Sequence, residues 1–169
     1  MQMFFENSID FVNMHYLVSQ RKGVFWEQAR QLKKSEKFLM FEDCIKNHKF
    51  DKKKKYEIHR ISVKQLGFKK PTKLKDIYKR LKLKRYKLIE PELAIYLRCL
   101  YIDQPKGEWL RIAVPFRSMI DSDNVPHLPK LGSALGKLFI ETYWSYPEAI
   151  FHPHNDFLVL KDDIKKINF

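Results

Sequence analysis

Cysteine and glycine are scarce in this chain, and long hydrophobic runs are missing from it. Only 2 of the 169 residues are cysteine, Cys44 and Cys99. Two isolated cysteines without metal-type spacing predict neither a disulfide framework nor a zinc site. No apolar run reaches the roughly 18 residues that a membrane-spanning helix needs, and the opening MQMFFENSID lacks the regions of a secretory signal. The sequence therefore predicts a cytoplasmic chain without a membrane span.

Apolar residues are plentiful by contrast. Hydrophobic residues make up 44% and aromatic residues 14% of the chain, which predicts a packed core and excludes global disorder. A length of 169 residues fits one domain, 1–169. We expect this domain to be a monomer.

Positive charge is also plentiful, and it is unevenly distributed. The formal net charge is +13, and much of it lies in a lysine-rich block at 52–88. Such a block predicts binding to nucleic acid or to an acidic partner. A solvated loop or helix face without a partner is the alternative interpretation. Residues 65–90 of this region are interpreted as a basic insertion into the domain.

Helices are predicted first along the chain and strands later, an order typical of an α+β domain with an antiparallel sheet. Hydrophobic periodicity predicts three N-terminal helices, at about 9–18, 25–32 and 38–48. Alternation of polar and apolar residues predicts a strand at 55–66, and two further strands are predicted at 92–103 and 108–115. The last two strands are expected to form a hairpin, and the tail at 149–164 is expected to form another, with its turn near 153–156. Residues 69–90 are predicted to be a loop or an exposed helix.

Two of the five glycines lie in LPKLGSALGKLF, residues 128–139. The leucines of this segment recur at helical spacing, yet a glycine inside a helix costs roughly 1 kcal/mol relative to alanine. If Gly132 and Gly136 bracket a helix start, the unpaired N–H groups there would form an anion site, and glycine would let the backbone approach the anion closely. A helix C-cap at Gly132 without any ligand is the alternative.

Two arginines lie within the predicted central hairpin. Arg98 shares a strand face with apolar residues such as Ala94, and arginine is rarely buried without a partner. Arg111 shares the face of the next strand with Trp109. Because a hairpin brings residues on both sides of its turn to similar heights, both guanidinium groups are expected to meet one dianionic ligand. Rim arginines whose aliphatic stems cover the sheet are the alternative.

Several short motifs, read in order, resemble the chorismate lyase family. They are FLMFEDC (38–44), YLRC (96–99), EW (108–109), RIAVP (111–115) and LGSALGKLF (131–139). In that family an acidic pair closes an apolar helix, an arginine lies on a central strand, and a tryptophan precedes an R-x-x-V-P strand. The resemblance covers roughly residues 36–140.

The resemblance implies an enzyme that converts chorismate into 4-hydroxybenzoate and pyruvate for ubiquinone synthesis, without metal or cofactor. It also implies an antiparallel sheet whose helical flaps enclose a pocket for a small aromatic carboxylate. Arg98 would hold the ligand carboxylate and take part in catalysis, and Leu135 would contact the ligand through its backbone. Arg111 and Gly136, predicted from the residues themselves, complete the substrate site. Asp162 in FLVLKDD is the nearest equivalent of the family's catalytic glutamate.

Two other functions are alternatives to the lyase. One is a catalytically inactive domain of the same fold that binds a small aromatic acid, as do the effector-binding domains of a class of bacterial transcription regulators. The other is a nucleic-acid- or partner-binding protein that uses the 52–88 block. No metal site is expected at His152, His154 and Asp156, because three ligands across a proline turn have poor geometry.

Overall fold

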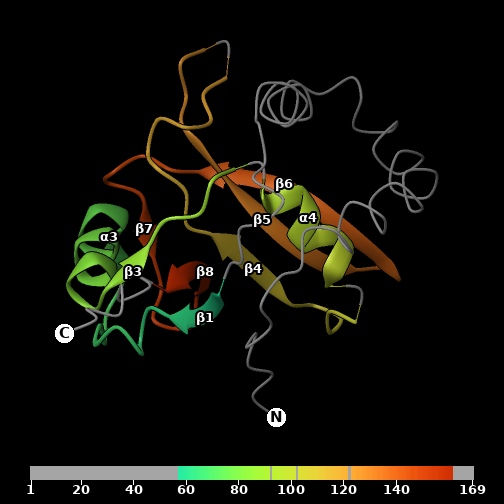
Figure 1. The fold of residues 1–169 in the computed structure, drawn as a ribbon, viewed down its shortest axis with the longest axis horizontal. Helices are drawn as coiled ribbons and strands as arrows, with labels where there is room; N and C mark the ends of the chain where they lie inside the picture. Colours follow the sequence, from blue (N-terminus) through green and yellow to red (C-terminus); the bar gives the residue numbers. More distant parts are fainter. Residues whose placement is uncertain (1–56, 92, 102, 122, 162–169) are drawn as a thin grey trace, which may run out of the picture.

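The computed structural model describes residues 57–91, 93–101, 103–121 and 123–161. These residues build a sheet in the order β1–β8–β4–β5–β6, and β3 also pairs with β8 (Figure 1). The strands of this sheet are β1 (Ile58–Ser62), β3 (Tyr86–Lys87), β4 (Trp109–Ile112), β5 (His127–Ala134), β6 (Lys137–Trp144) and β8 (Asp156–Lys161). Every pairing in it is antiparallel except that of β4 with β8. Together with two helices, this sheet confirms the predicted α+β class.

Three predictions concern other parts of the chain. The helices expected before residue 50, the cysteine at 44 and the aspartate at 162 lie outside the described residues.

β8 is an interior strand of the sheet, between β1 and β4. Phe157, Leu158 and Val159 are consecutive and all buried, which requires cover on both faces of the strand because neighbouring side chains point to opposite faces. β1 pairs along its full length with β8 and buries Ile58 and Ile61. The strand predicted at 55–66 is therefore confirmed, with shorter bounds.

The tail does not form the predicted hairpin. A turn is present near Pro153, where the N–H of Asn155 donates to the carbonyl of His152 at 2.9 Å. The strands on its two sides have different partners, however: β7 (Ile150–Phe151) pairs with β2 (Thr72–Lys73) in a separate two-stranded sheet, whereas β8 joins the main sheet. A local turn thus leads the chain from one sheet into the other.

The strand predicted at 92–103 is wrong, because this segment contains helix α4 (Leu93–Leu100). Leu93, Leu97 and Tyr101 are buried at intervals of four residues, which is the spacing of one helix face. Pro91 precedes the helix and its carbonyl accepts from the N–H of Ala94 at 3.0 Å, and proline is favoured where a helix begins. A short apolar run is compatible with either a helix or a strand. In this chain it forms a helix, one face of which packs in the core. The predicted hairpin between this segment and 108–115 is consequently wrong as well.

The helix predicted within 128–139 is also wrong, because the segment is a hairpin of β5 and β6. Leu135 and Gly136 form its two-residue turn, with φ angles of 51° and 70°, and positive φ at both positions is typical of a type I′ turn. Gly132 has a different use. A Cβ at this position would lie 2.0 Å from Cζ3 of Trp109, so the indole ring occupies the space that any other side chain would need.

Helix α3 (Leu74–Leu83) lies within the basic insertion, at the end of the molecule opposite α4 (Figure 1). It buries Leu74, Ile77, Tyr78 and Leu81, and the Tyr78 hydroxyl donates to the carbonyl of Val114 at 2.8 Å. The segment was predicted to be a loop or an exposed helix, and the burial of this helix face was not predicted. The opposite, lysine-rich face is exposed as predicted. Within the described part of the chain, neither helix is long and apolar enough to cross a membrane.

Candidate functional site

Arg98 lies in α4 and is buried, with only 2% of its surface exposed. Its Nη1 donates to Oε1 of Gln104 at 2.5 Å and to the carbonyl of Gly132 at 3.2 Å, and its Nη2 donates to the carbonyl of Tyr101. Gln104 in turn donates to the carbonyl of Leu131 at 3.2 Å. Arg98 therefore connects α4 to strand β5 through protein acceptors. Its predicted role in holding a ligand carboxylate stays a prediction.

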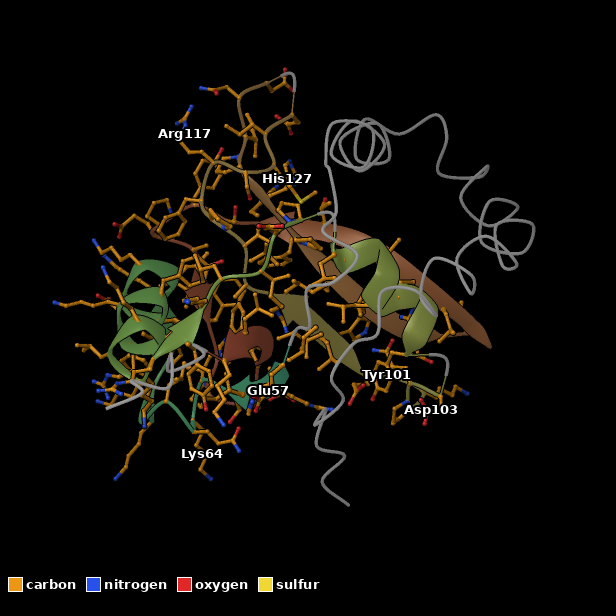
Figure 2. The ribbon with its side chains drawn as sticks, viewed as in Figure 1. Glu57, Lys64, Tyr101, Asp103, Arg117 and His127 are labelled. Carbon is orange, nitrogen blue, oxygen red and sulfur yellow. The ribbon has the colours of Figure 1, made fainter. Side chains whose placement is uncertain are left out.

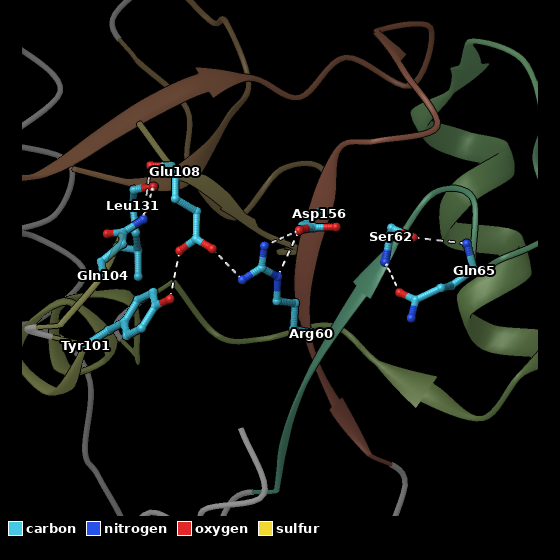
Figure 3. Close-up of polar contacts among 8 residues, drawn as sticks. All are labelled: Arg60, Ser62, Gln65, Tyr101, Gln104, Glu108, Leu131 and Asp156. Carbon is cyan, nitrogen blue, oxygen red and sulfur yellow. Dashed lines mark hydrogen bonds and ion pairs between the residues drawn. The ribbon is translucent and has the colours of Figure 1, made fainter. Parts of the chain in front are cut away.

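A polar network lies next to this contact and was not predicted (Figure 3). Arg60 of β1 donates through Nε to Oδ2 of Asp156 at 2.8 Å and through Nη1 to Oε1 of Glu108 at 2.5 Å. The Tyr101 hydroxyl donates to the other oxygen of Glu108 at 2.8 Å. Burial and this hydrogen bond to a carboxylate raise the pKa of the Tyr101 hydroxyl. No sequence pattern links these four residues, and their mutual pairing indicates a structural role.

Arg111 of β4 has a different environment. Its guanidinium carbon lies 5.7 Å from the ring centroid of Phe151 and 5.8 Å from that of Tyr143. Its Nε is buried without a hydrogen-bond partner among the described residues, and burial lowers the pKa of this guanidinium. Arg111 and Arg98 thus have different partners. Their contacts do not bring the two guanidinium groups to one ligand, as had been expected.

Leu135 and Gly136 lie at the exposed tip of the hairpin. Leu135 is 87% exposed, and no atom outside the turn comes within 4 Å of a Cβ placed on Gly136. No helix starts at this position, so the predicted anion site formed by helix N–H groups is absent from it.

The largest accumulation of charge lies on α3 and the segments beside it. Residues 64–90 contain eleven lysines and arginines but only two acidic residues, Asp76 and Glu90. Ten of the cations are exposed and together are called the basic face: Lys64, Lys69, Lys70, Lys73, Lys75, Lys79, Lys82, Lys84, Arg85 and Lys87. Figure 2 shows nitrogen-tipped side chains projecting outward around α3, on the side of the molecule where Lys64 is labelled.

The basic face is only partly neutralised by neighbouring carboxylates. Lys73 and Lys75 each lie 2.6 Å from a carboxylate oxygen of Glu148, and these ion pairs lower the pKa of the Glu148 carboxyl. Such exposed pairs contribute little to stability. Lys79 and Lys82, farther along the helix, have no carboxylate partner in the part of the chain that is described.

A groove of about 630 Å³ crosses the basic face beside α3. Its lining combines apolar and cationic side chains: Phe68, Pro71, Thr72, Lys73, Asp76, Lys79, Arg80, Leu83 and Ile150. Leu83 is 71% exposed and Ile150 is 48% exposed. Sequence reasoning missed this groove, although one signal was available: Leu83 falls outside the buried stripe of α3.

One wall of the groove is held in place by Arg80. Its guanidinium carbon lies 4.9 Å from the centroid of the Phe68 ring, and its Nη1 donates to the carbonyl of Leu66 at 3.0 Å. Gly67 between them has a φ of 98°, and a Cβ there would lie 3.1 Å from Nη1 of Arg80. The glycine lets the chain turn closely around the arginine, which fixes the aromatic ring.

Two histidines of the turn before β8 lie close together. The rings of His152 and His154 stack with centroids 5.6 Å apart, and no group of three or more metal-ligating side chains occurs among the described residues. His127 is buried and its Nε2 lies 2.7 Å from Oδ2 of Asp121, a contact that holds the loop before β5 against the sheet.

Comparison of the whole chain with models of known families, with curated proteins and with solved structures finds no match.

Proposed function

We propose that the protein binds nucleic acid through the basic face. The observation that carries this proposal is the excess of exposed lysines over carboxylates on one ordered surface that α3 anchors in the core. The apolar residues of α3 fix this helix in the core, so the lysines of α3 form a rigid array of charge rather than a loose tail.

An ordered cationic surface suits a phosphate backbone. Each lysine that neutralises a phosphate releases a condensed counterion, so binding weakens steeply with added salt. Lysine ammonium groups act as point charges that contact phosphates without reading a base sequence. The proposed binding is therefore largely independent of sequence.

A pair of matched variants tests this proposal by fluorescence anisotropy with a labelled oligonucleotide across a salt series. Lys79→Gln with Lys82→Gln removes two cations from the basic face. Lys106→Gln with Arg117→Gln removes two exposed cations elsewhere, so both variants have the same net charge.

We expect the first pair to reduce affinity. It should also make the negative slope of log K against log salt shallower by roughly 1.4 to 1.8, the change expected for the loss of two phosphate contacts. The second pair should leave the slope within error of wild type. Equal effects of both pairs would show attraction by net charge alone, and undetectable binding by wild type at low salt would refute the proposal.

The environment of Arg111 favours a second candidate, which is the binding of a small aromatic carboxylate, as the chorismate lyase resemblance implies. A half-buried guanidinium beside two aromatic rings, with Nε buried and unpartnered among the described residues, offers a donor for a carboxylate and a surface for a ring. Calorimetry with 4-hydroxybenzoate and an assay for pyruvate release from chorismate test it. Binding that Arg111→Gln abolishes supports this candidate, and no binding and no pyruvate release refute it.

A further inference from the structure

We propose that the groove beside α3 holds an unpaired base, so that the protein prefers single-stranded to double-stranded nucleic acid. This inference rests on the proposed function and adds to it the class of nucleic acid. It starts from Leu83 and Ile150, two exposed apolar residues on a predominantly cationic surface that also carries Asp76. They come from elements far apart in sequence and line the same groove.

The groove has the features that a nucleotide requires. Its apolar lining from Phe68, Leu83 and Ile150 can pack against the flat face of a base. Lys79 lines the same groove and supplies a cation for the adjoining phosphate. A volume of about 630 Å³ lies within the range of clefts that hold small ligands, about 300–1,000 Å³.

Only a base outside a duplex can use this site. In a double helix the base faces are stacked and the backbone keeps them away from a protein surface, whereas single strands offer unstacked bases to apolar and aromatic side chains. The contact between Arg80 and Phe68 keeps the aromatic wall in one position before any ligand arrives, which reduces the entropy lost on binding.

A lipid surface is the other anionic partner to consider. Exposed apolar residues among lysines also occur in proteins that bind anionic membranes. The apolar residues here line a groove of about 630 Å³, however, and a flat bilayer would leave that groove unfilled. The shape of the site therefore favours a base.

Three probes at fixed salt test the inference: a single strand, the duplex of the same sequence, and a single strand of the same length made of abasic sites. The variant is Leu83→Asn, and the matched control is Leu135→Asn, which changes another exposed leucine, on the hairpin tip. Both leucines are exposed, so thermal unfolding should show that each variant is folded.

Wild type should bind the single strand more tightly than both the duplex and the abasic strand. Leu83→Asn should weaken single-strand binding about fivefold, at the lower end of base-stacking contributions, and should leave duplex and abasic binding unchanged. Leu135→Asn should leave the affinity for all three probes unchanged.

Equal affinity for all three probes, with no effect of Leu83→Asn, would overturn the inference while the proposed function stands. Absence of binding to every probe would refute the proposed function itself. Tighter binding to phosphatidylserine vesicles than to the single strand, weakened by Leu83→Asn, would assign the groove to a membrane and overturn the inference.

Discussion

The turn of the β5–β6 hairpin carries a leucine where the backbone favours another residue. Leu135 has a φ of 51°, and the left-handed region costs an L-residue roughly 1–2 kcal/mol. Asparagine tolerates this region better, and Asn-Gly is a preferred pair for type I′ turns. Because Leu135 is 87% exposed, Leu135→Asn removes little packing. We expect it to stabilise the protein by about 1 kcal/mol.

Thermal unfolding followed by circular dichroism measures this gain. For a chain of this size, about 1 kcal/mol raises Tm by roughly 2–4 °C. The same change at an exposed helical leucine, Leu83→Asn, should lower Tm slightly, since asparagine has the lower helix propensity. The two variants therefore shift Tm in opposite directions.

A fall in Tm with Leu135→Asn would refute the hairpin. If residues 128–139 formed a helix, asparagine would replace a good helix former and reduce stability by a few tenths of a kcal/mol. The sign of the shift thus separates the observed fold from the helix that the leucine spacing predicts.

Three further predictions follow from single contacts. Gly132→Ala should destabilise the protein by about 1–3 kcal/mol, since the new Cβ overlaps the indole of Trp109 and overpacking has costs of this size. An unchanged midpoint of urea unfolding, or an unchanged Tm on heating, would contradict that packing. Arg98→Ala should cost about 3 kcal/mol or more, because several buried carbonyl acceptors lose their donor, whereas a small loss would contradict its anchoring role. The hydrogen bond from His127, together with backbone N–H donors, lowers the pKa of Asp121. The contribution of the Asp121 carboxylate to stability is therefore present above the unfolded pKa of about 3.9 and declines as pH falls below it. Asp121→Asn should make Tm less dependent on pH between about pH 4 and 2, and identical pH profiles for both proteins would refute this.

Sequence patterns predicted the described elements only in part. The strand at β1 was predicted from alternation, although its buried residues Ile58 and Ile61 are three positions apart and so lie on opposite faces. The exposed lysine face of α3 was predicted because the lysines there are separate from the apolar stripe. The segment of α4 was assigned to a strand because a short, almost wholly apolar run has no informative period. Pro91 is a start signal for a helix, and the prediction did not use it.

The glycine-rich segment shows a second limit of sequence patterns. Gly132 accommodates Trp109 and Gly136 completes a turn, and these two reasons act at different levels of structure. A contact with a distant tryptophan cannot be derived from local spacing, so the two glycines together were interpreted as one backbone site. The pairing of β4 with β8 depends on similar long-range packing.

The candidate site was predicted in composition but not in shape. The lysine-rich block predicted an anionic partner, and the described part of that block is an exposed cationic surface. The groove beside it combines Phe68 and Leu83 from the insertion with Ile150 near the end of the chain. Because these residues are separated in sequence, only the fold brings them to one place.

Lysine footprinting tests the central claim most directly. The protein is acetylated with and without a bound single-stranded oligonucleotide, and the modification of each lysine is measured by mass spectrometry. Lys79, Lys82 and Lys84 should be protected by the oligonucleotide, whereas Lys106, exposed in the turn before β4, should react equally in both samples. Protection of Lys106 equal to that of the α3 lysines, or no protection of the latter at an oligonucleotide concentration that saturates binding, would contradict the assignment of nucleic-acid binding to the basic face.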